Sequence, residues 1–272
     1  FTHLVLIVGV VIVVFPVYLA FVASTHSGSD FLRGLVPLLP GPHMIENYSR
    51  MLFDGISTAG APPLWTMLLN STIIAIVIAI GKITISLLSA YAIVFFKFPF
   101  RIVAFWIIFI TLMLPVEVRI IPTFAVVANL GLLNSYLGLT LPLIASATAT
   151  FLFRQFFLTV PDELMEAARV DGAGPMKFFR DILLPLSRTN IAALFVILFI
   201  YGWVQYLWPM LVTTDSRYYT VVMGIKRLAA TADAEPQWHL VMAAAVLAML
   251  PPVLVVIFMQ RLFVKGLVET EK

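Results

Sequence analysis

Lys82 is the residue with the clearest potential for chemistry, because it is the only charge in the apolar run "LLNSTIIAIVIAIGKITISLL". An ionisable side chain is costly inside a membrane, so such residues usually bind a ligand or pair with another charge. A cation that faces a polar path through the membrane would complement a phosphate group. Two other interpretations stay open: Lys82 extends its ammonium to the membrane surface, or it pairs with another subunit.

The run "YGWVQYLWPM" (201–210) contains a second candidate site. On a continuous helix, Tyr201, Gln205 and Trp208 stand at i, i+4 and i+7 and therefore share one face. Aromatic rings with an amide suit stacking on a polyol or a sugar. Aromatic residues at this spacing are also common in helix packing and in the interfacial belts of membrane proteins, so both interpretations are kept.

Catalytic and nucleotide-binding sites are not apparent in the chain. It has no cysteine, which excludes disulfides, thiolate metal sites and cysteine nucleophiles. The four histidines, His3, His26, His43 and His239, have no metal-ligand spacing. The stretch "AIGKIT" (79–84) lacks the earlier glycine of a phosphate-binding loop, since position 76 is Ile, and Ile83 replaces the required Ser or Thr. An intramembrane enzyme is therefore disfavoured, and any ATP would bind to another protein.

The segment "DELMEAARVDGAGPMKFFRDILLP" (162–185) is charged and lies between apolar runs. Pro161 suits a first helical turn, and the two acidic residues after it complement the positive end of a helix. Gly172 predicts a left-handed turn that ends this helix. Pro175 then predicts a second short helix, which Pro185 delimits.

Both predicted helices expose apolar side chains among charges, as do helices that bind in a groove of a protein partner. The alternative is an amphipathic loop on the lipid surface. Interfacial helices tend to be rich in Lys and Arg, whereas this segment contains five carboxylates. The charge pattern favours a protein partner.

These sites must be positioned by membrane helices. The chain has 272 residues, 61% hydrophobic and 11% charged, with a mean hydropathy of +1.04; soluble proteins have about 45–50% apolar and about 25% charged residues. A transmembrane helix needs about 20 apolar residues. Six ranges qualify: 2–23, 65–96, 103–128, 135–157, 189–212 and 240–263. We predict an all-α integral membrane protein with six transmembrane helices in one domain, 1–272.

Two of these spans need comment. The first, 2–23, is too long and uniform for the core of a signal peptide and is expected to remain as a membrane helix. The third, 103–128, is broken by two prolines, which predicts a kinked or re-entrant outer end. Glu117 and Arg119 lie between them. They either pair with each other, which is the favoured interpretation, or line an outer gate.

The distribution of Lys and Arg, which are enriched in cytoplasmic loops, predicts the orientation. Ten of the 17 Lys and Arg residues lie after spans two and four and in the C-terminal tail, six lie on the other side, and Lys82 lies within a span. Both termini are therefore expected in the cytoplasm, with the charged loop 158–188. The external loops 24–64 and 213–239 are long, so each is expected to contact a partner or act as a lid.

The charged segment resembles the EAA loop of ABC-importer permeases. The pattern is Glu-Ala-Ala, three residues, Gly, nine residues, Ile and then Leu-Pro, matched by Glu166, Ala167, Ala168, Gly172, Ile182, Leu184 and Pro185. The runs "LLNSTIIAI", "SAYAIVFFKF" and "GLLNSYLGLTLPL" resemble carbohydrate-uptake permeases. More narrowly, "ITLMLPVEVRIIPT", "ASATATFLFRQFF" and "FIYGWVQYLWP" resemble permeases of sn-glycerol-3-phosphate importers. The resemblance covers nearly the whole chain.

The resemblance implies a type I permease fold in the bacterial inner membrane, with a cytoplasmic coupling helix seated in a cleft of an ATP-binding subunit. Closure of the two ATPases would move this helix and alternate access to the path. The implied ATPase-coupling residues are Glu166, Ala167, Ala168, Asp171, Gly172, Ala173, Phe178, Phe179 and Pro185. The candidates for the substrate path are Lys82, Glu117, Arg119, Tyr201, Gln205 and Trp208.

The implied partners are a second homologous permease, a dimer of ATP-binding subunits, an external solute-binding protein and membrane lipid, with no nucleic acid. The chain itself is expected to be no enzyme and to bind no cofactor, since ATP and Mg would belong to the ATPase. The expected solute is sn-glycerol-3-phosphate or a glycerophosphodiester. The alternatives are a permease for another carbohydrate, such as an oligosaccharide, and, from a different class, a channel or passive facilitator.

Overall fold

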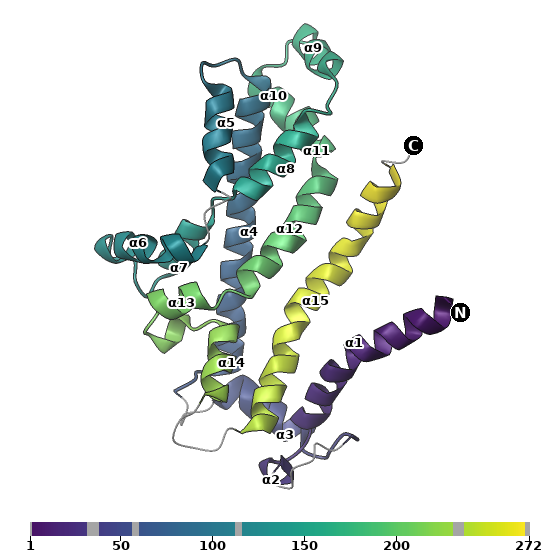
Figure 1. Cartoon of the computed structure of the whole chain (residues 1–272), viewed down its shortest axis with the longest axis vertical. Helices are drawn as coiled ribbons and strands as arrows, with labels where there is room; N and C mark the ends of the chain where they lie inside the picture. Colours follow the sequence, from purple (N-terminus) through teal and green to yellow (C-terminus); the bar gives the residue numbers. More distant parts are fainter. Residues whose placement is uncertain (1, 32–37, 56–59, 112–115, 231–236, 270–272) are drawn as a thin grey trace. The chain divides into compact units, whose positions relative to one another are not determined.

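The computed structural model describes residues 2–31, 38–55, 60–111, 116–230 and 237–269, with side chains except at 116–117 and 261–269. Within these ranges the regular elements are helices and no β-strand occurs (Figure 1). The predicted all-α class is therefore confirmed.

Three described helices are long and apolar enough to cross a membrane: α1 (Thr2–Ser24), α4 (Leu64–Phe95) and α15 (Trp238–Glu269). Two bent pairs of shorter helices raise the number to five if each pair is one span. α5 (Arg101–Ile110) and α6 (Val116–Asn129), which cover the third predicted span, are both short. Six spans therefore remain a prediction.

The prediction of one continuous helix over 189–212 is wrong. α12 (Arg188–Trp203) ends before Val204, and α13 (Leu207–Val212) begins three residues later. Pro209 provides the reason: it has no N–H to donate to the carbonyl of Gln205, four residues earlier, and its ring clashes with that carbonyl. Tyr201, Gln205 and Trp208 therefore do not share a face of one helix.

The predicted span 135–157 is also interrupted. α7 (Tyr136–Thr140) and the short 3-10 helix η4 (Leu141–Leu143) meet α8 (Ala147–Phe157) at a bend of 47°. Ser146 starts α8 by accepting a hydrogen bond from the N–H of Ala149 (3.2 Å), which satisfies one of the unpaired donors at a helix start.

The chain divides into two compact units, residues 1–72 with 204–253 and residues 73–203 with 254–272. The first unit also contains α2 (Gly28–Phe31), α3 (Met44–Ser49), η1 (Arg50–Asp54), η6 (Ser216–Tyr218) and α14 (Val221–Ala229). There the amide of Asn70 donates to the carbonyls of Arg217 (2.7 Å) and Tyr219 (3.0 Å), and the N–H of Val221 donates to Ser71 Oγ (2.9 Å). The first turns of α4 thus hold the loop that precedes α14.

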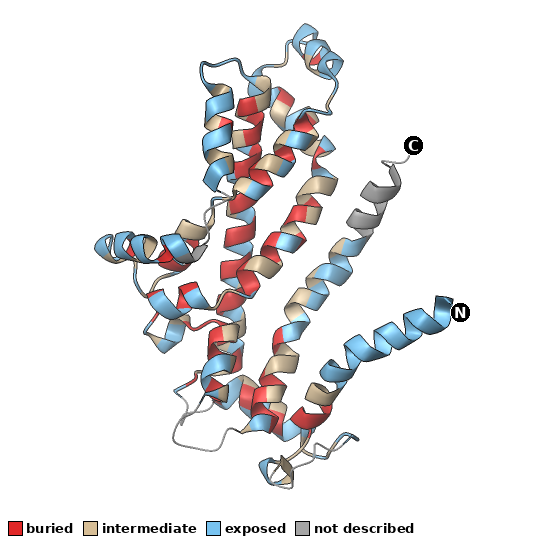
Figure 2. Cartoon of the chain, viewed as in Figure 1, coloured by how far each residue is buried: buried red, intermediate tan, exposed pale blue. Residues whose placement is uncertain are grey.

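In the second unit, α4 presents a buried face along its length (Figure 2). Ala75, Ala79, Lys82, Ser86 and Ala90 lie on it at intervals of three or four residues, as one helix face requires. Small side chains let neighbouring helices approach closely in membrane proteins. α12 uses this: a Cβ added at Gly202 would lie 2.8 Å from the Cα of Ala75.

α1 differs from α4 because most of its apolar side chains are exposed (Figure 2). Only its last three residues, from Val22 to Ser24, are buried. A helix that is apolar all round requires an apolar environment, and lipid provides one.

Candidate functional site

The charged segment begins with α9 (Asp162–Val170), which follows Pro161 and has two carboxylates in its first turn. It ends in a Schellman motif centred on Gly172, whose φ is +73°. The N–H of Gly172 donates to the carbonyl of Arg169 (3.0 Å), and the N–H of Ala173 to that of Ala168 (2.8 Å). The predicted glycine turn is present.

The second part of the segment is one helical stretch with a widened middle. α10 (Pro175–Phe178) continues through the π-helix η5 (Phe179–Leu183) into α11 (Leu184–Leu186). Pro185 was predicted to delimit this helix but lies inside it. It cannot donate to the carbonyl of Asp181, four residues earlier, and the i→i+5 turns before it accommodate that missing bond. The helix bends by 72° into α12 instead, at Ser187.

Aromatic contacts fix the segment to α4. The ring of Phe178 lies 5.4 Å from that of Phe95, and the ring of Phe179 lies 5.0 Å from that of Tyr91. The hydroxyl of Tyr91 also donates to the carbonyl of Pro175 (2.8 Å). Phe178 is only 4% exposed, and Phe179 faces α4 as well, so both rings contact this chain. Their part in ATPase coupling stays a prediction.

The outward surface of the segment consists of other residues. Glu166, Ala167 and Asp171 are exposed, whereas Ala168 is buried within this chain. Val170 and Met176 are 87% and 67% exposed. These two apolar residues were not among the predicted coupling residues. They could have been found in the sequence as apolar side chains close to the glycine turn.

A cleft of about 1130 Å³ is lined by residues of α9 and of the end of α4. α9 projects from its unit (Figure 1). The aromatic lining of the cleft consists of Tyr91, Phe95, Phe96, Phe157 and Phe178. Its charged lining residues are Lys97, Arg101, Asp162, Glu166 and Arg169. Because the lining residues come from two distant stretches of sequence, 91–101 and 157–178, the local sequence pattern could not predict this cleft.

Lys82 and Tyr201 are brought together by the fold. Lys82 is only 7% exposed, and its Nζ lies 3.8 Å from the centre of the Tyr201 ring, well within the range of a cation–π interaction. Lys82 does not extend to the surface of this chain, so the first alternative for it is excluded.

The other predicted path residues lie on α6 and after the end of α12. Arg119 is an exposed residue of α6, and the side chain of Glu117 lies outside the described residues. Gln205 lies in the break before α13, and Trp208 is buried within α13.

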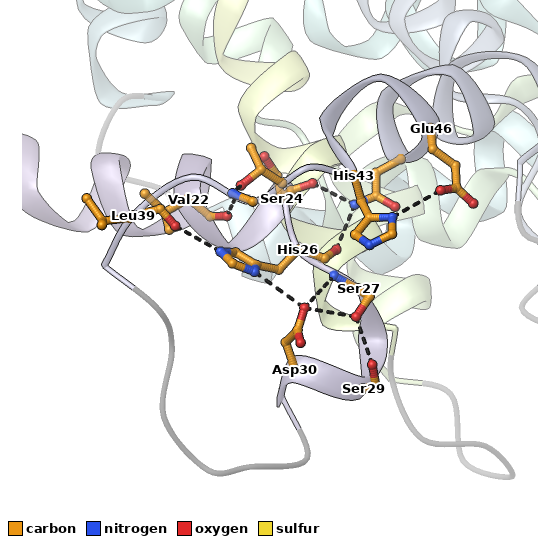
Figure 3. Close-up of polar contacts among 12 residues, drawn as sticks. Val22, Ser24, His26, Ser27, Ser29, Asp30, Leu39, His43 and Glu46 are labelled. Carbon is orange, nitrogen blue, oxygen red and sulfur yellow. Dashed lines mark hydrogen bonds and ion pairs between the residues drawn. The ribbon is translucent and has the colours of Figure 1, made fainter.

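The loop after α1 is held by its own polar side chains (Figure 3). The carboxylate of Asp30 accepts hydrogen bonds from the hydroxyl (2.8 Å) and the N–H (3.0 Å) of Ser27, and His26 Nδ1 lies 3.4 Å from it. The Ser27 hydroxyl and N–H, with His26, hold the pKa of Asp30 below its usual 3.8, because they stabilise the charged form.

Replacing Ser27 with alanine is expected to raise the pKa of Asp30. A carboxylate with a lowered pKa stabilises the folded loop above its ordinary pKa, and this stabilisation is lost as the pH falls through the lowered value. A ¹³C NMR titration of the Asp30 carboxyl in detergent measures the shift. Ser29→Ala is the matched control, since Ser29 contacts Ser27 (2.8 Å) and makes no described contact with Asp30. An equal Asp30 pKa in Ser27→Ala and in the wild type would contradict the prediction.

The fold is shared with a solved membrane transporter. The crystal structure of a bacterial ABC transporter involved in the import of the acidic polysaccharide alginate superposes with a TM-score of 0.83, covering 96% of this chain and 94% of that one at 22% identity. The two chains therefore share one fold.

Sequence relatives cover the whole chain. It is 60% identical over 99% of its length to the sn-glycerol-3-phosphate transport system permease protein UgpE of Brucella melitensis, and 62% identical over 99% to that of Rhizobium meliloti. The corresponding protein of Yersinia pestis is 59% identical over 100%. Each alignment covers 96% of the relative.

Residues 82–269 match the family of binding-protein-dependent transport system inner membrane components. The chain belongs to this family. Together with the apolar helices, this makes it a multi-pass protein of the inner membrane.

Proposed function

We propose that this chain is a permease subunit of an ATP-driven bacterial importer for sn-glycerol-3-phosphate or glycerophosphodiesters. The observation that carries the choice of solute is the identity of 60% and 62%, over 99% of the chain, to permeases named for sn-glycerol-3-phosphate transport. The chain crosses the membrane six times with both termini in the cytoplasm. A second, homologous permease forms the other half of the path.

The surface around α9 is the docking site for an ATP-binding subunit, which binds ATP and Mg. Its exposed residues include an apolar pair, Val170 and Met176, and the carboxylates of Glu166 and Asp171. Among the described side chains no cation lies within 4.0 Å of Glu166, which leaves it available to a basic group on the ATPase. A passive channel would have no use for such a surface.

Movement of the docked helix reaches the membrane through α4. Phe178 and Phe179 pack on Phe95 and Tyr91 of α4, so they act as positioning residues. Lys82 lies nine residues before Tyr91 on the same helix, or about 13 Å at 1.5 Å per residue. A rigid-body shift of α9 and α10 therefore moves the part of α4 that carries Lys82, as alternating access requires.

Stimulation of ATP hydrolysis tests the proposed function. The complex of this chain, the second permease, two ATPase subunits and the external solute-binding protein is reconstituted in proteoliposomes. We expect sn-glycerol-3-phosphate and a glycerophosphodiester to stimulate hydrolysis and maltose to have no effect. The control omits the solute-binding protein. Stimulation by the neutral sugar alone would identify a permease for another carbohydrate.

A further inference from the structure

Lys82 is a buried cation without a described anion. It is 7% exposed in an apolar 32-residue helix, and within the part of the chain that the structure describes no carboxylate oxygen lies within 4.0 Å of it. An uncompensated charge in such an environment is strongly unfavourable. Its position therefore calls for a negative partner from outside the described residues.

The one described group on the ammonium is the ring of Tyr201, 3.8 Å from Nζ to the ring centre. A ring face attracts a cation but carries no net charge, so it holds the ammonium in place without neutralising it. The ammonium keeps its capacity to donate hydrogen bonds to an anion.

The break between η4 and α8 is seated on α4 on both sides of Lys82. A Cβ added at Gly81 would lie 2.7 Å from Ile144 Cγ2, and the hydroxyl of Ser86 donates to the carbonyl of Ser146 (3.2 Å). Interrupted spans are tolerated in membranes where they are buried in protein or line a cavity. Ser146 is the N-cap of α8, so the positive end of this helix meets α4 at Ser86, one helical turn after Lys82.

Among the described residues, the charged group that acts on Lys82 is Arg119, which is a second cation. Two cations and a helix N-terminus with no described carboxylate between them favour a ligand that is an anion.

We propose that Lys82, held by Tyr201, binds the phosphate group of the solute as it crosses the membrane. This rests on the proposed function, because it takes the solute to be phosphorylated. A phosphomonoester carries a charge of about −1.5 to −2 at pH 7 and three strong acceptor oxygens. It supplies the negative charge and the acceptor oxygens that no described residue provides to Lys82. A diester carries a single charge and supplies fewer of them.

Uptake by the complete reconstituted importer tests the site. Lys82→Met keeps most of the side-chain length and removes the charge, and Lys82→Arg keeps the charge. We expect Lys82→Met to lower uptake of sn-glycerol-3-phosphate on the order of 10- to 100-fold, since a hydrogen bond to a charged group is lost, and uptake of a glycerophosphodiester by less. Lys82→Arg should retain more uptake than Lys82→Met.

Lys226→Met is the matched control, because Lys226 also lies over a tyrosine ring (Tyr206, 5.5 Å) but is exposed to solvent. Any effect of this control should be equal for the two solutes. If the Lys82→Met importer takes up sn-glycerol-3-phosphate at the wild-type rate, the phosphate site is overturned and the proposed function is not affected. A Lys82→Met complex that loses its second permease also overturns it, since Lys82 then pairs with that subunit. A wild-type complex that imports only neutral sugars overturns the proposed function, and the phosphate site with it.

Discussion

An importer that carries Gly172→Arg is expected to hydrolyse ATP while importing little or no solute. Gly172 closes α9 with a φ of +73°, a left-handed conformation that costs a residue with a Cβ about 1–2 kcal/mol. Arginine adds this strain and places a long cation on the proposed docking surface. Both effects change the direction of α9, so that closure of the proposed ATPase partners would no longer be transmitted to α4.

The measurement is ATP hydrolysis and solute uptake in the same proteoliposomes. Gly174 provides the control: a Cβ added at either glycine meets no atom within 4 Å, but Gly174 has a φ of −71°. Gly172→Ala should therefore lower the uptake per ATP several-fold, and Gly174→Ala should have a small effect. Glu166→Lys, which reverses a charge without backbone strain, should uncouple as well. Uptake at the wild-type rate by Gly172→Arg would falsify the role of the glycine turn at Gly172 in coupling.

Gly202→Val is expected to reduce the stability of the permease itself. The added Cβ would lie 2.8 Å from the Cα of Ala75 and 3.4 Å from its carbonyl oxygen. Backbone atoms cannot rotate away as a side chain can, so α12 and α4 must move apart. Overpacking of this kind costs about 1–3 kcal/mol. Thermal unfolding in detergent, followed by size-exclusion chromatography, measures the loss.

Two variants show whether the backbone contact is responsible. Ala75→Gly should not rescue Gly202→Val, because it leaves the Cα of residue 75 in place. Gly224→Ala provides the contrast. Its Cβ would overlap the thioether of Met67, which is the flexible end of a side chain. Met67→Ala should therefore restore the stability that Gly224→Ala loses. Rescue of Gly202→Val by Ala75→Gly would show that the clash is with a methyl group instead.

Much of the charged segment 162–185 could be predicted because its signals are local. Pro161, Gly172 and Pro175 act on the φ and ψ angles of their own and adjacent residues. α9 begins at Asp162, Gly172 has the expected positive φ, and α10 begins at Pro175. The contribution of these residues to ATPase coupling stays a prediction.

Predictions that needed the direction of a side chain were less successful. Phe178 and Phe179 belong to an amphipathic pattern, but that pattern does not say whether the apolar face meets a partner or the same chain. Their contacts are with Phe95 and Tyr91, more than 80 residues earlier. The prediction of one continuous helix over 189–212 was wrong for a different reason. It rested on hydropathy, which takes no account of Pro209.

The amino-acid sequence by itself determined the lipid environment, the helical class and the glycine turn at Gly172. Each of these depends on composition or on residues a few positions apart. The tertiary structure decided which groups meet. Tyr91 bonds to the carbonyl of Pro175, 84 residues later, and Lys82 lies under Tyr201. Such contacts depend on the packing of helices at close range, down to one missing Cβ at Gly202, which hydrophobic periodicity does not encode.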